Sequence, residues 1–145
     1  MYSTVQTLHS YWAYLTLLIL AIAAINALLG ARSNKEFSIS KDLRISLFAL
    51  IFSHIQLLLG LVLYLVSPNG LEKITTLGMG GMSSLDRLLA LEHPVINIIA
   101  IALITIGWSK HKKQTTSKAK FSKIGVFYSL GLILILSRIP WNLWF

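Results

Sequence analysis

Four side chains in apolar stretches of the chain could bind a metal or a charged ligand: His9, His54, His93 and Arg138. His54 stands out because it lies inside the apolar run Phe52–Tyr64, with the amide of Gln56 two positions on. Inside a bilayer an ionisable residue has no water to satisfy it, so it marks a functional site by default. Imidazoles on different helices can ligate the iron of a b-type haem, and a guanidinium can pair with a haem propionate.

The composition is that of a small membrane protein. Of the 145 residues, 55% are hydrophobic and only 12% are charged, and the mean hydropathy is +0.71. A soluble domain of this length would carry far more charge. The absence of cysteine excludes disulfides, iron–sulfur clusters, thiolate zinc sites and covalent c-type haem attachment. We expect residues 1–145 to form a single membrane domain.

Four stretches are long and apolar enough to cross a bilayer as helices, which takes about 20 residues each. Their approximate bounds are 8–30, 44–66, 88–109 and 124–141. They predict an all-α, four-helix transmembrane bundle. Ser83 or Ser84 with Asp86 is typical of a helix start before the third span. We expect a Lys-rich turn at 110–123 and a Gly-rich loop at 78–81.

The basic residues predict the orientation of the bundle. Ten Lys and Arg residues lie in the segments that join the first span to the second and the third to the fourth, against two between the second and the third. The positive-inside rule then makes the two basic segments cytoplasmic and places both termini outside, N-out and C-out. We expect a multi-pass protein of the bacterial inner (cytoplasmic) membrane.

A straight-helix count places all four candidate side chains in the outer half of the membrane. At about 1.5 Å per residue from the cytoplasmic boundary, His54 lies about 15 Å deep, Arg138 about 22 Å, His93 about 25 Å and His9 about 30 Å. We expect His111, in the Lys-rich segment, to be solvated. The alternative for each candidate is an ordinary role: an interfacial or hydrogen-bonded imidazole, or an arginine that snorkels to the surface.

We expect His54 and His93 to be the axial pair of a haem b, because both lie within the bilayer, where an unpaired imidazole costs most. His9 would ligate a second site or lie at the surface. Arg138 would face the bundle interior and bind a propionate. Zinc and di-iron sites in bundles need carboxylate ligands, and Glu92 is the acid nearest to a span.

These residues belong to segments that are similar to a known group of proteins. The segments are 9–12, 54–64 with 67–68, 92–93 with 100–107, and 135–141. Through them nearly the whole chain resembles short, four-span inner-membrane proteins of Bacteroidota that are commonly labelled cytochrome b. The piece around Gln56 is faintly similar to one half of the haem A synthases. The resemblance implies a haem-binding bundle with His9, His54 and His93 as candidate ligands. The chain departs from the pattern after His9, where an arginine commonly follows within a few residues.

The function expected from the sequence is that of a b-type haem-binding membrane cytochrome, which transfers electrons in the outer half of the inner membrane. One alternative is a haem-free accessory or structural subunit of a larger membrane complex, and another is a haem-handling enzyme. An electron carrier or subunit is favoured over a stand-alone enzyme, because no catalytic set of side chains is visible. The expected partners are the lipid bilayer and a quinone or a respiratory-chain complex, and not nucleic acid.

Overall fold

The computed structural model describes residues 1–144, which are helical without any strand. Four helical stretches are long and apolar enough to cross a membrane, which confirms the predicted all-α bundle and indicates a multi-pass membrane protein. The elements in chain order are α1 (Tyr2–Arg32), the π-helical turn η1 (Ile39–Leu43), α2 (Arg44–Val66), α3 (Leu71–Gly81), α4 (Ser84–Arg87), the π-helical turn η2 (Leu88–Glu92), α5 (His93–Lys112), α6 (Ser117–Ser137) and α7 (Trp141–Trp144).

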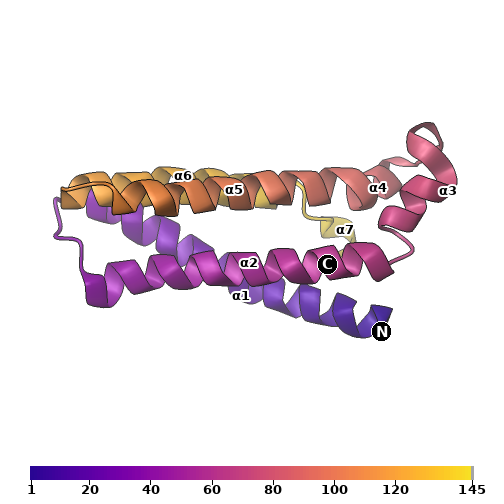
Figure 1. Cartoon of the computed structure of the whole chain (residues 1–145), viewed down its shortest axis with the longest axis horizontal. Helices are drawn as coiled ribbons and strands as arrows, with labels where there is room; N and C mark the ends of the chain where they lie inside the picture. The colour runs from indigo at the N-terminus through magenta and orange to yellow at the C-terminus, as the bar shows by residue number, and fades with distance from the viewer. Residues whose placement is uncertain (145) are drawn as a thin grey trace.

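The four long helices form a ring in which α1 and α5 each pack against both α2 and α6. Figure 1 shows both termini, α3 and α7 at one end of the bundle, which we call the terminal end. The α1–α2 and α5–α6 connections lie together at the other end, which we call the basic end. The two segments that carry most of the positive charge therefore share one end of the molecule.

Two connections differ from the prediction. Helix α5 runs to Lys112 and α6 begins at Ser117, so most of the Lys-rich segment is helical rather than a turn. The Gly-rich segment is the last part of α3, which breaks at Gly78, where φ is +65° and glycine is favoured. The predicted helix start is confirmed, since Ser83 and Asp86 form a reciprocal capping box at the start of α4.

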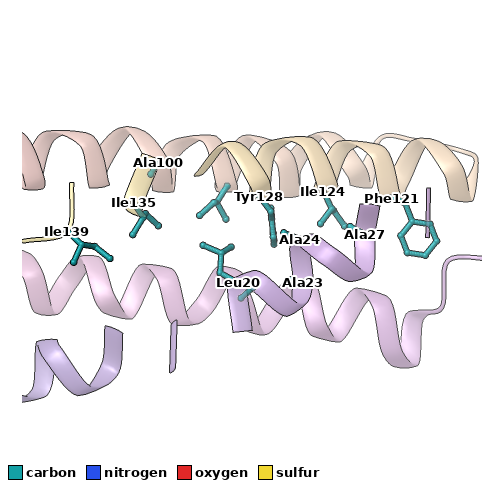
Figure 2. Close-up of a cluster of buried hydrophobic side chains, with 12 residues drawn as sticks. Leu20, Ala23, Ala24, Ala27, Ala100, Phe121, Ile124, Tyr128, Ile135 and Ile139 are labelled. Carbon is teal, nitrogen blue, oxygen red and sulfur yellow. The ribbon is translucent and has the colours of Figure 1, made fainter. Parts of the chain in front are cut away.

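The core lies toward the basic end, where small residues bring α1 and α6 close together. All the buried residues of α1 lie from Thr16 onward. A Cβ on Gly30 would lie 2.6 Å from the ring of Phe121, so a larger residue would push α6 away. Figure 2 shows Phe121 and Tyr128 of α6 lining the same interior as Leu20 of α1. Close packing of this kind holds helices together in lipid. The first half of α1, which has no buried residue before Thr16, is packed less closely at the terminal end.

Buried polar groups at the basic end are paired. Asp42 is fully buried and accepts hydrogen bonds from Asn26 Nδ2 (2.8 Å), Lys35 Nζ (3.0 Å) and the backbone nitrogen of Ser38 (2.8 Å). These contacts hold the α1–α2 connection against α1. A buried carboxylate needs such partners to offset its lost hydration. The basic end is thus held together by paired polar groups as well as by packing, and the site lies at the other end.

Candidate functional site

A cavity of about 230 Å³ opens between the helices in the terminal half of the bundle. Its walls come from residues 2–17 of α1, 53–64 of α2 and 93–101 of α5, and from the end of α6 together with α7. The part of α1 that lines it spans about 22 Å at 1.5 Å per residue, so the cavity extends along this helix. None of the described residues that line it is Lys, Arg, Asp or Glu. The cavity is therefore suited to a largely apolar ligand.

Two imidazoles from different helices meet in this cavity. The ring centres of His9 on α1 and His93 on α5 lie 6.2 Å apart, with their planes at 81°. A metal–imidazole bond is about 2 Å long and the ring centre lies about 1 Å beyond the nitrogen, so two imidazoles on opposite sides of one metal have centres about 6 Å apart. The pair thus has the separation that two axial ligands of one iron require.

The ring of His93 is held in one tautomer. Its Nδ1 lies 2.7 Å from the backbone carbonyl oxygen of Arg138. Because a carbonyl oxygen can only accept, Nδ1 donates the hydrogen, and the lone pair of Nε2 stays free for a metal. A second hydrogen-bonding group that orients a metal-binding imidazole in this way is a common feature of metal sites. His93 is therefore prepared to act as a ligand through Nε2.

Gln56 occupies the space beside His9. Its Nε2 donates to the backbone carbonyl of His9 at 3.0 Å and lies 3.3 Å and 3.4 Å from the two ring nitrogens. Gly60, one helical turn further on, leaves room for the ring, since a Cβ there would lie 3.2 Å from Cε1 of His9. The Oε1 of Gln56 is buried and has no hydrogen-bond partner within the described residues. A ligand that binds His9 must displace this amide.

His54, which we expected to pair with His93, does not line the cavity. Its Nδ1 lies 2.8 Å from the carbonyl oxygen of Leu50, and its Nε2 lies 3.3 Å from Oγ1 of Thr105 on α5. The reason is helical geometry, because residues two apart lie about 200° apart around a helix. When Gln56 faces the cavity, His54 faces elsewhere. The structure thus brings His9, and not His54, next to His93.

Arg138 contributes its backbone rather than its side chain to the site. We expected its guanidinium to face the bundle interior. The side chain is instead 45% exposed, and its Nε lies 3.3 Å from Oε2 of Glu92. Helix α6 ends at Ser137, which places Arg138 toward the terminal end of the bundle, where its guanidinium reaches an acid that does not line the cavity. Its carbonyl oxygen, however, accepts the hydrogen bond from His93.

The structure also corrects the expectation for His111. Its side chain is 1% exposed, so it is buried rather than solvated. Its Nδ1 donates to the carbonyl of Trp108, and its ring lies 4.6 Å from the Trp108 ring and 5.7 Å from that of Phe37. This imidazole is part of the packing at the basic end and lies far from the cavity.

Reasoning from the sequence missed Asn97, which lines the cavity one turn after His93. Its Nδ2 donates to the carbonyl of His93 at 2.6 Å and lies 3.2 Å from Nδ1 of the same ring. The signal was present, because an amide four residues from an imidazole in an apolar span lies on the same helix face. Asn97 therefore adds a second polar group beside the ring of His93.

The site contains a pair of imidazoles and not a multi-residue metal centre. In residues 1–144, no group of three or more His, Asp or Glu side chains lies close enough to hold a metal ion. A pair of imidazoles suits a metal whose other ligands come from a macrocycle. Comparisons of the chain with protein-family models, curated proteins and solved structures find no match.

Proposed function

We propose that this chain is a b-type haem protein of the membrane, with His9 of α1 and His93 of α5 as the axial ligands. The observation that carries the proposal is the His9–His93 pair, with ring centres 6.2 Å apart inside an uncharged cavity. The fixed tautomer of His93 supports it, because the free Nε2 is the atom that an iron would bind.

The shape of the cavity also supports this proposal. It extends along α1 both above and below His9, so the apolar body of a macrocycle could lie along the helices. Ligand pockets commonly measure about 300–1,000 Å³, so a haem would displace the side chain of Gln56 and widen the cavity from its present 230 Å³. The cavity reaches Tyr2 and Trp144 at the terminal end, where water could solvate the propionates.

The ligand pair favours electron transfer over catalysis. A haem whose iron is held by two imidazoles would supply single-electron transfer rather than substrate activation. His9 and His93 would hold the group, and the apolar walls would exclude water from it. With both termini outside, the cavity would open at the outer face of a bacterial inner membrane. The electron partner would be a quinone or a respiratory-chain complex that contacts the terminal end.

A second candidate is that the cavity binds a quinol directly, without haem. Two observations favour it: the lining residues carry no charge to pair with propionates, and the buried Oε1 of Gln56 lacks a hydrogen-bond donor. A quinol is neutral and has hydroxyl donors. The haem proposal is preferred because a quinol does not require two imidazoles at the spacing of metal ligands.

The test is an absorption spectrum of the purified protein, oxidised and then reduced with dithionite. We expect the sharp bands of a six-coordinate, low-spin b-type haem. His9→Ala and His93→Ala should each abolish this spectrum. His54→Ala is the matched control and should keep it, because His54 lies outside the cavity.

The other outcomes separate the alternatives. A protein that carries no haem and takes up none from added haemin would refute the proposal, and would leave a quinol site or a haem-free subunit. Loss of haem only in His54→Ala would refute the assigned ligands. A five-coordinate spectrum with turnover of the bound haem would favour a haem-handling enzyme.

A further inference from the structure

Glu92, at the end of η2, binds two arginines from different parts of the chain. Its Oε1 lies 3.4 Å from Nε of Arg87, and its Oε2 lies 3.3 Å from Nε of Arg138. Arg87 is a neighbour in the preceding turn, whereas Arg138 lies at the end of α6. The second ion pair therefore connects the start of α5 to the end of α6.

This ion pair closes a ring of contacts around His93. Glu92 and His93 are adjacent in the chain, and both hold Arg138, one through its guanidinium and the other through its carbonyl oxygen. The carbonyl can accept the Nδ1 hydrogen only while Arg138 stays in place. If the guanidinium were released, the end of α6 could move and the imidazole could rotate about its side-chain bonds.

We propose that Glu92 is a positioning residue for His93. By holding Arg138, it keeps the carbonyl acceptor at Nδ1 and so directs Nε2 of His93 into the cavity toward His9. The consequence for ligand binding rests on the proposed haem function, whereas the effect on the imidazole itself does not.

A positioning role for Glu92 and a structural role predict different effects on stability and on metal affinity. The side chains of Glu92 and Arg138 are 36% and 45% exposed. An ion pair this exposed contributes little to stability, because water and salt screen it. Its loss should therefore leave folding almost unchanged. Loss of an outer group that orients a metal ligand, in contrast, commonly costs about 10-fold to 100-fold in metal affinity.

The first experiment is ¹⁵N NMR of the histidine side chains in the haem-free protein, which tests the positioning without any cofactor. In the wild type we expect His93 to be in the Nδ1–H tautomer. In Glu92→Gln we expect a mixture of tautomers. Arg87→Gln is the matched control, because it removes the other ion pair of Glu92 but leaves the connection to Arg138, and its His93 should match the wild type.

The second experiment uses the haem-loaded protein. In Glu92→Gln we expect haem dissociation at least about 10-fold faster than in the wild type. We also expect an altered low-spin EPR signal, which depends on the angle between the two imidazole planes, with an unchanged unfolding temperature. Arg87→Gln should leave all three unchanged.

The outcomes distinguish the two proposals. If the wild type binds no haem but His93 changes tautomer only in Glu92→Gln, the haem function is wrong and the positioning role stands. If His93 is the same in both variants and the wild type, the positioning role is wrong whatever the haem content. A Glu92→Gln protein that fails to fold would also overturn it, because Glu92 would then be a structural residue.

Discussion

The Nδ1 hydrogen of His93 is donated to the backbone carbonyl of Arg138 at 2.7 Å, across 45 positions of sequence. The acceptor is free because the last carbonyls of a helix have no partner within it, and α6 ends at Ser137. Pro140 helps to end the helix, since it lacks a backbone N–H and disfavours helical geometry in the residue before it. The end of α6 thus supplies the hydrogen-bond acceptor for the imidazole of His93 on α5.

We predict that Pro140→Ala weakens haem binding by about 10-fold, the lower end of what loss of an orienting group costs. The substitution lets α6 extend past Arg138, so that a backbone N–H takes the carbonyl that His93 now uses. Titration of the haem-free protein with haemin measures the effect. Pro68→Ala, in the α2–α3 connection, is the control and should bind as the wild type does. Equal haemin affinities for both variants would show that the end of α6 at Ser137 does not affect haem binding.

A second prediction concerns Gln56, whose amide lies against both ring nitrogens of His9. A haem that binds His9 must displace this amide and lose about one hydrogen bond, worth about 1 kcal/mol. Gln56→Ala should therefore raise the affinity for haemin by about fivefold. Gln6→Ala is the control, because Gln6 lines the same cavity and has no hydrogen bond to either imidazole. Weaker binding by Gln56→Ala would mean that Gln56 holds His9 in place for the ligand.

The fold could be predicted because its signals are local. Each long apolar span must be a helix in lipid, where every backbone group has to be paired internally. The capping box of Ser83 and Asp86 was visible for the same reason, since it depends on residues three apart. The helical character of the Lys-rich segment was missed, because polarity alone suggested a turn.

Which imidazoles meet in the cavity could not be predicted in the same way. The depth count placed His93 closer to His9 than to His54, but the cost of burying an unpaired imidazole favoured His54. His54 is not unpaired, because the carbonyl oxygen of Leu50 and the hydroxyl of Thr105 contact its two ring nitrogens. Such partners depend on how α2 faces α5, and on the loose packing of the first half of α1, which no local pattern encodes.

A third prediction tests the close packing of α5 on α6. A Cβ on Gly131 would lie 2.7 Å from Cγ1 of Ile104 and 3.0 Å from the carbonyl oxygen of Ala100. Gly131→Ala should lower the free energy of unfolding by about 1–3 kcal/mol, as overpacking of a core does. Thermal unfolding in detergent measures this. Gly80→Ala in α3 is the control, with no atom within 4 Å of the added Cβ, and should change stability little. A Gly131→Ala protein as stable as the Gly80→Ala protein would show that α5 and α6 can separate without cost.

The last prediction concerns which side of the membrane the cavity faces. Ten Lys and Arg residues lie in the two segments at the basic end, against two in the segment between α2 and α5. Because positively charged segments are retained in the cytoplasm, we expect the terminal end to face outward. A reporter enzyme that works only in the periplasm should be active when it is fused to the C-terminus. The same reporter inserted in the α1–α2 connection should be inactive, and a reporter that needs the cytoplasm should give the reverse pattern. Activity of the cytoplasmic reporter at the C-terminus would instead place His9, His93 and the mouth of the cavity on the inner side, with an electron partner in the cytoplasm.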